Sequence, residues 1–224
     1  MNILGHPFVA CTVLKKVNWQ IVAGSILPDI VPFVPQSVFS FEEIHENPER
    51  FLFFLEKNYP SEKDLALGMM THSVKFGADR FSPMIEKRLL GTDLKARKQL
   101  ANKIVDCSGV SLEMAQTARI HNYLWAGFDV YLLKQKSDLV EEIRSVCQEI
   151  DQDRTTDLLA EWAKKDRFRV RKIVAVLFDF LKFDPFASVS CLVSGYKSFF
   201  AGLPEKDALI QGKTERLFEE IYQE

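Results

Sequence analysis

The chain contains four histidines, and each lies where an imidazole nitrogen could bind a metal ion or a phosphate group. The histidines are His6, His45, His72 and His121. Three aspartates are placed to join them: Asp29 in a Leu-Pro-Asp turn, Asp79 after His72, and Asp129 after His121. Imidazole nitrogen combined with carboxylate oxygen suits zinc, manganese or iron, whereas a calcium site would use mostly oxygen. The pattern therefore predicts a divalent metal centre.

The predicted helix around His72 limits how it could share an ion with Asp79. A capping signal at Ser61 predicts a helix that runs to about Phe81, with His72 in its middle. Residues seven apart lie on one face of a helix but are about 10 Å apart along its axis. On this helix His72 and Asp79 would therefore share a face without touching.

Apolar residues recur with the 3.6-residue period of a helix in almost every segment, and almost nowhere with the period of a strand. We therefore expect an all-α fold. The predicted helices are 8–17, 19–27, 50–55, 61–81, 94–105, 112–133, 138–150, 156–164, 169–181, 187–201 and 205–222. Between 28 and 41 we expect an irregular loop, because its prolines, Pro28, Pro32 and Pro35, are too closely spaced for regular structure.

Composition bounds the class of protein. The 29 basic and 31 acidic residues give a formal net charge of −2, so no global field attracts nucleic acid or an anionic membrane, although local patches stay open. A hydrophobic content of 47% with 18 phenylalanines can fill one core. The start of the chain lacks the features of a secretory signal, and no stretch is apolar enough to span a membrane. We expect a single soluble, cytoplasmic domain over 1–224.

The four cysteines show neither a metal-binding nor a disulfide pattern. They are Cys11, Cys107, Cys147 and Cys191, which lie far apart in unrelated apolar stretches without a Cys-x-x-Cys pair. We interpret them as small buried hydrophobic residues in a reducing compartment. Any metal site must then be built from histidine and carboxylate.

The order of these motifs resembles that of the zinc-dependent phospholipase C superfamily. The elements are His6, Gly24-Ser25-Ile26-Leu27-Pro28-Asp29, His45, Gly68-Met69-Met70-Thr71-His72 and His121, within residues 1–129. The resemblance implies an all-α fold whose inward side chains hold one to three zinc ions and hydrolyse phosphodiesters. Related nucleases share that fold, so the resemblance leaves the substrate class open. The helical half, 138–224, carries no candidate ligand.

The chain departs from this family at two positions. The family places Asp four residues after the histidine of Gly-x-x-x-His, and Glu four residues after its last histidine. Here those positions are Phe76 and Trp125. Asp79 and Asp129 could substitute in a shifted register. Alternatively, the site holds one ion or none.

The expected function is metal-dependent hydrolysis of a phosphoester, either a small molecule or a phospholipid head group. The candidate ligands are His6, Asp29, His45, His72 and His121, and Asp29 or Asp79 would act as general base. The alternative is a non-catalytic helical interaction or lipid-binding module with a vestigial or structural metal. The His-Asp phosphohydrolase class is less favoured, because its adjacent His-Asp pair is absent. We expect no sequence-specific nucleic-acid partner, and a homo-oligomer stays open.

Overall fold

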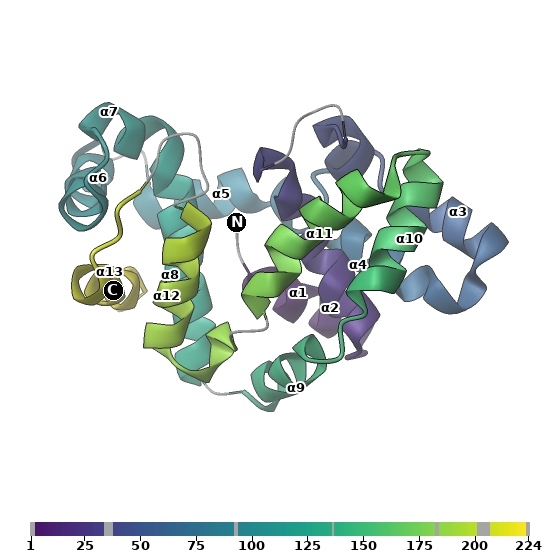
Figure 1. Cartoon of the computed structure of the whole chain (residues 1–224). Coiled ribbons are helices and arrows are strands. Elements are labelled where there is room, and N and C mark those ends of the chain that lie inside the picture. Colours follow the sequence, from purple (N-terminus) through teal and green to yellow (C-terminus); the bar gives the residue numbers. More distant parts are fainter. Residues whose placement is uncertain are drawn as a thin grey trace. The chain divides into compact units, whose positions relative to one another are not determined.

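The computed structural model describes residues 3–33, 38–91, 94–135, 137–181, 184–200 and 207–222. Within these ranges every regular element is helical and none is a strand, which confirms the all-α prediction (Figure 1). The α-helices are α1 (Gly5–Leu14), α2 (Trp19–Ile26), α3 (Glu49–Asn58), α4 (Lys63–His72), α5 (Ser82–Leu90), α6 (Leu94–Ser108), α7 (Leu112–Met114), α8 (Ile120–Gln135), α9 (Asp138–Cys147), α10 (Gln152–Ala163), α11 (Arg167–Leu181), α12 (Val189–Phe200) and α13 (Gln211–Glu220). Among these described helices, none has the length and apolar character needed to cross a bilayer.

Shorter helical turns connect these elements. Four are 3-10 helices: η1 (Leu27–Phe33), η3 (Pro60–Glu62), η4 (Ala78–Arg80) and η6 (Pro185–Ala187). Two are π-helical: η2 (Glu42–Glu46) and η5 (Ala115–Arg119). The expectation of an irregular loop from residue 28 was wrong as far as Phe33, because its prolines fit a 3-10 turn. The rest of that loop up to residue 37 lies outside the described residues.

The contacts within the chain form two compact units. Unit 1 consists of Met1–Gly5, Ser82–Ser137 and Phe183–Glu224, and unit 2 of His6–Phe81 and Asp138–Lys182. The single domain expected over the whole chain stays a prediction. His6, Asp29, His45, His72 and Asp79 all belong to unit 2.

In unit 2, α2 and α4 cross in backbone contact. A Cβ atom added to Gly24 would lie 2.0 Å from the carbonyl oxygen of Leu65, and one added to Gly68 would lie 2.4 Å from that of Ile21. No side chain larger than hydrogen fits at either position. The two glycines therefore bring α2 and α4 close together; α4 ends at His72, and η1, which follows α2, carries Asp29.

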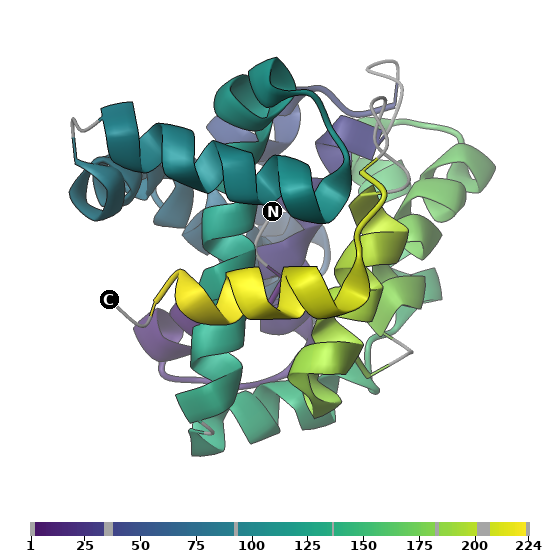
Figure 2. The same ribbon diagram turned by 90° about the vertical axis from the view of Figure 1, so that its left-hand side faces the viewer.

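In unit 1, α8 supplies a buried polar anchor. Asp129 is fully buried and accepts hydrogen bonds from the backbone N–H groups of Ile3, Leu4 and Gly5 and from the hydroxyl of Tyr196. Asp129 is thus a structural acceptor for the backbone that leads into α1. Figure 2 shows α13 in yellow crossing α8.

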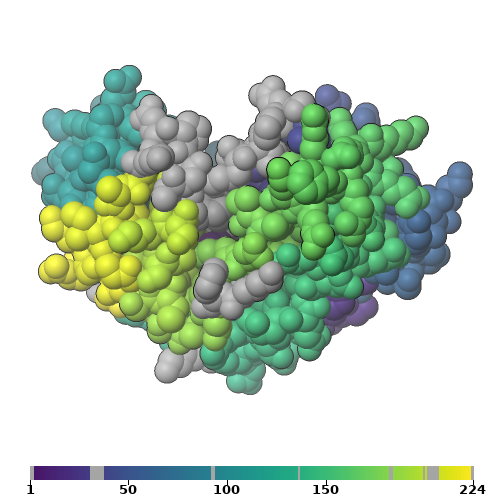
Figure 3. Space-filling view, in the orientation of Figure 1, coloured from purple at the N-terminus to yellow at the C-terminus, as the bar shows by residue number. Residues whose placement is uncertain are grey.

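Helix α13 also packs on α6. Lys103 of α6 forms a 2.9 Å ion pair with Glu220 of α13, and the side chains of these two helices adjoin in Figure 3. A shallow hollow of about 280 Å³ lies between the two helices and is lined by charges of both signs.

Several predicted boundaries need correction. Helix α5 was not predicted, and α10 begins at Gln152 rather than at residue 156, because Asp151 accepts a hydrogen bond from the backbone N–H of Arg154. Helix α12 begins at Val189, after Ser188 accepts one from Cys191. The predicted start of the last helix at residue 205 lies outside the described residues, and its described part begins at Gln211.

Candidate metal centre

Helix α4 ends at His72, so the predicted helix to Phe81 was wrong. Ser73 leaves helical geometry with ψ of 156°, and its hydroxyl accepts a hydrogen bond from the backbone N–H of Phe76 at 3.1 Å. The backbone N–H of Gly77 then bonds the carbonyl of Ser73 at 2.9 Å and closes a turn. A serine hydroxyl that bonds nearby backbone competes with the helix in this way.

Gly77 allows the chain to fold back after α4. A Cβ atom at this position would lie 2.2 Å from the carbonyl oxygen of Thr71, so the turn passes too close to α4 for any larger residue. The short helix η4 follows and carries Asp79. As a result, Asp79 returns toward the residue at which α4 ended.

Asp79 lies among three histidines. Its Oδ2 atom is 3.3 Å from Nε2 of His72 and 3.8 Å from Nε2 of His45, and its Oδ1 atom is 3.8 Å from Nε2 of His6. The prediction that Asp79 and His72 could not touch was therefore wrong, because it assumed one continuous helix. Asp79, and not a residue at position 76, supplies the carboxylate beside His72, while Phe76 is 48% exposed.

The histidines reach this place from three separate elements. His6 lies in the first turn of α1, His45 in η2 and His72 at the end of α4. Reciprocal hydrogen bonds between Ser40 and Glu43 cap the start of η2. The carbonyl of His45 also accepts a hydrogen bond from Val74 in the turn after α4, which ties η2 to that turn.

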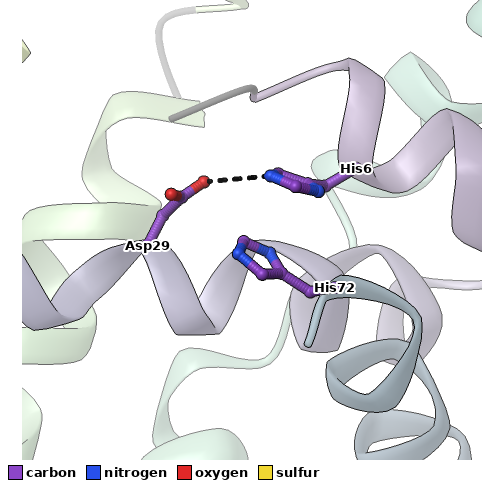
Figure 4. A group of neighbouring side chains, drawn as sticks. All are labelled: His6, Asp29 and His72. Carbon is purple, nitrogen blue, oxygen red and sulfur yellow. Dashed lines mark ion pairs between the residues drawn. The ribbon is translucent and has the colours of Figure 1, made fainter. Parts of the chain in front are cut away.

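Two overlapping groups of candidate ligands result. One consists of His6, Asp29 and His72, and the other of His45, His72 and Asp79; within each group the ligand atoms lie within 4.8 Å of one another. Figure 4 shows the first group, in which Oδ2 of Asp29, on η1, lies 3.9 Å from Nε2 of His6. These groups could hold a metal ion.

The three imidazoles are buried with a nitrogen left over on each ring. Their side chains are 8%, 7% and 1% exposed for His6, His45 and His72, respectively. Within the described part of the chain, Nδ1 of His6, Nδ1 of His45 and Nε2 of His72 are buried without a hydrogen-bond partner. Such groups are rare in folded proteins because each costs free energy. Nε2 of His72 faces Asp79 and suits a cation, whereas the unpartnered Nδ1 atoms of His6 and His45 are not the nitrogens that face Asp79.

His72 is held in the tautomer that a metal requires. Its Nδ1 atom lies 2.6 Å from the backbone carbonyl of Ser25 on α2. A carbonyl oxygen only accepts, so Nδ1 carries a proton, and Nε2, which faces Asp79, is the nitrogen left for a metal. Metal-binding histidines commonly donate their second nitrogen to a carbonyl in this way.

Electrostatics favour neutral rings beside a retained negative charge. Burial and the nearby His72 lower the pKa of His6 well below its usual value, and they lower the pKa of His45 to about 3. Burial alone would also lower the pKa of His72, but the charge of Asp79 outweighs it and the pKa rises. Burial alone would raise the pKa of Asp79, but His72 and the other histidines lower it strongly. Positive charge is therefore stabilised at this carboxylate, whether from a proton or from an ion.

The structure does not bring His121 into either group. His121 belongs to unit 1, its side chain is 44% exposed, and its Nδ1 atom lies 3.6 Å from Glu86. Trp125, one turn further along α8, donates a 2.9 Å hydrogen bond to Ser82. The Asp129 carboxylate accepts hydrogen bonds from the backbone of residues 3 to 5. We therefore leave His121 and Asp129 out of the proposed site.

Two supporting residues were not predicted from the sequence. Ser25 orients His72 through its carbonyl, and Gly77 permits the turn that returns Asp79. Gly77 could have been suspected, since a glycine two residues before a candidate ligand interrupts a helical pattern. The role of Ser25 left no signal, because every residue has a carbonyl.

The fold and the site define an all-α protein with buried histidine–aspartate groups suited to a divalent metal ion. No protein-family model, no curated protein and no solved structure matches the chain. The function can therefore be inferred only from the chemistry of the site.

Proposed function

We propose that the protein is a zinc-dependent phosphoester hydrolase whose metal ligands are His6, His45, His72 and Asp79. The observation that carries this proposal is the convergence of three buried imidazoles on one carboxylate. Two neutral rings, one ring with a fixed tautomer and a permanently charged Asp79 form a donor set of three nitrogens and one carboxylate. Such a set suits zinc best, with manganese and iron next.

The contacts of Asp79 have the lengths expected between ligands of a single ion: its Oδ1 atom faces His6, and its Oδ2 atom faces His45 and His72. Zinc lies about 2.0 to 2.2 Å from nitrogen and oxygen ligands, so ligand atoms around it are about 3 to 4 Å apart. The contacts of Asp79 with the three histidines span 3.3 to 3.8 Å. His72 has only Nε2 to give, because Nδ1 is bonded to Ser25. The two candidate groups share this one nitrogen, and we therefore propose one zinc ion.

Asp79 and Asp29 have different roles in the proposed reaction. Zinc at such a site supplies Lewis acidity, which lowers the pKa of water and polarises a phosphoryl oxygen. Asp79 is a ligand and a poor proton acceptor, since the histidines lower its pKa. Asp29 lies beside His6 and His72, with its Oδ2 atom 3.9 Å from Nε2 of His6, and we assign it to orient the attacking water and accept its proton.

Arg80 supports a phosphoester as the substrate. It follows Asp79 directly in η4, its side chain is exposed, and it forms no ion pair with any described residue. Its guanidinium lies 5.9 Å from the centre of the Phe81 ring. A guanidinium without an ion-pair partner suits the oxygens of a phosphate. The resemblance to the zinc-dependent phospholipase C superfamily points to the same chemistry. Both a small phosphoester and a phospholipid head group are substrates of this kind.

Elemental analysis of the purified protein by inductively coupled plasma mass spectrometry is the first test. We expect about one zinc per chain in the wild type and loss of zinc in His72→Ala, because His72 belongs to both candidate groups. His121→Ala is the matched control, since it makes the same change in unit 1 and should keep the metal. Circular dichroism checks that both variants stay helical. A wild-type chain that neither carries zinc nor takes it up would overturn the proposal.

A non-catalytic module with a structural zinc is the second candidate. The deep burial of the three imidazoles favours it, whereas the 25% exposure of the Asp79 side chain gives a substrate a way in. Hydrolysis of bis(p-nitrophenyl) phosphate by the zinc-loaded chain distinguishes the two. Turnover that falls in Asp29→Asn while zinc is retained supports the hydrolase. Zinc without turnover supports the structural role.

A further inference from the structure

Helix α5 exposes large apolar side chains to solvent. Met84 is 63% exposed, Leu89 is 44% exposed and Ile85 is 36% exposed. Ser82 is the only buried residue among the described residues of this helix. Exposed apolar residues that cluster on one helix are typical of an interaction surface.

The same face of α5 is cationic. Lys87 and Arg88 are exposed and form no ion pair with any described residue, and on a helix of 100° per residue Arg88 projects between the exposed Met84 and Ile85. Glu86, the one acidic residue of the helix, points the other way and bonds Arg97 of α6 at 2.7 Å. The outer face of α5 therefore carries apolar groups and positive charge without a negative one.

The apolar side chains and positive charges of α5 together indicate what kind of partner it binds. A second copy of the chain in a symmetric dimer would place Lys87 and Arg88 against the same cations, which repel. A protein partner would have to receive the convex α5 in a groove that is both apolar and acidic. An anionic bilayer accepts the apolar side chains into its interface and the cations at its head groups.

We propose that α5 is an amphipathic helix that docks the protein on an anionic lipid surface. Met84, Ile85 and Leu89 enter the interface, and Lys87 and Arg88 bind the negatively charged head groups. This inference goes beyond the proposed function and does not depend on it, because no metal ligand lies on α5.

Co-sedimentation of the full chain with vesicles tests the electrostatic part. We expect binding to vesicles of phosphatidylcholine and phosphatidylserine in equal amounts, and little binding to phosphatidylcholine alone. Lys87→Glu with Arg88→Glu should weaken binding by about tenfold or more. The control is Lys57→Glu with Arg169→Glu, which changes the charge equally at exposed positions of α3 and α11.

Serine substitutions test the apolar part at constant charge. Met84→Ser with Leu89→Ser should weaken binding to the same vesicles by about tenfold. The control is Phe53→Ser with Val176→Ser, which removes apolar side chains that are 65% and 54% exposed elsewhere. These positions should leave binding unchanged.

Three outcomes would overturn the proposal: equal binding to both kinds of vesicle, equal loss in the control variants, or no loss in the α5 variants. Analytical ultracentrifugation without lipid adds a fourth, a dimer that dissociates when the residues of α5 are changed. Binding that requires phosphatidylserine and fails only in the α5 variants supports it.

Discussion

A single carboxylate sets the protonation of His72 within the histidine cluster. Burial favours the neutral form of every group there, but the charge of Asp79 raises the pKa of His72 while the histidines lower that of Asp79. The stacked rings of His6 and His72, with centroids 3.7 Å apart, disfavour two protonated imidazoles. Positive charge is therefore the natural complement of the cluster, and a divalent ion would supply it together with coordination bonds.

Gly77→Ala tests whether the turn after α4 delivers Asp79. The added methyl group would meet the carbonyl of Thr71, so the turn must open and carry Asp79 away from His72. We expect metal affinity to fall by about tenfold or more, as for loss of a group that orients a metal ligand. Competition against a fluorescent zinc chelator measures the affinity.

Gly212→Ala is the control for this substitution. Nothing lies within 4 Å of a Cβ atom at Gly212, which is in α13 of unit 1. It should leave metal binding unchanged and stabilise the helix by about 0.5 to 1 kcal/mol. If Gly77→Ala binds zinc as tightly as Gly212→Ala does, the turn is not what positions the ligand.

At the scale of elements, periodicity located helices well and their ends poorly. The segment through Met70, His72 and Phe76 continues an apolar pattern, so the sequence favoured one helix to Phe81. In the structure, the Ser73 hydroxyl and the close passage at Gly77 end that helix. Both effects depend on contacts in three dimensions that a pattern of apolar residues does not encode. The five site residues of unit 2 were still identified by type, because imidazoles and carboxylates are few.

Asp64 connects three elements of unit 2, and its contribution to the stability of the fold should depend on pH. It accepts hydrogen bonds from Lys16, which follows α1, and from Asn18, which caps α2. Burial alone would raise the pKa of Asp64, but these partners lower it. A carboxyl with a lowered pKa stabilises the fold above its unfolded pKa of about 3.9, and the effect disappears as the pH falls through the lower folded value.

We therefore expect Asp64→Asn to lower the free energy of unfolding by about 1 to 2 kcal/mol at pH 7. The difference from the wild type should shrink in acid below pH of about 4. Urea unfolding at several pH values measures it. Asp106→Asn is the control, because Asp106 is exposed and forms no ion pair with any described residue. A difference that is the same at every pH would contradict the charge-based explanation.

At the scale of the whole molecule, the metal site should contribute to stability. Among the described residues, unit 2 buries the Nε2 atom of His72 without a hydrogen-bond partner, which costs free energy until an ion binds it. An ion that binds only the folded chain adds RT ln(1 + [L]/Kd), about 2.7 kcal/mol when its free concentration is a hundred times Kd. The fold is thus coupled to metal availability.

Chelator treatment tests this coupling. We expect the chelator to lower the melting temperature of the wild type by several degrees and that of His72→Ala hardly at all. Differential scanning calorimetry with and without zinc measures both. Equal shifts in the two proteins would mean that the chelator acts elsewhere than at this site.

The bond between His72 and Ser25 has a consequence for how this protein can vary. The acceptor is the backbone carbonyl of Ser25, so substitution of that serine leaves the acceptor in place. What fixes the proton on the imidazole is the relative position of α2 and α4, which the contacts at Gly24 and Gly68 set. A small slide of one helix along the other would release Nδ1 and let the proton move to Nε2. The position of the proton on His72 thus depends on how α2 and α4 pack and not on the side chain at position 25.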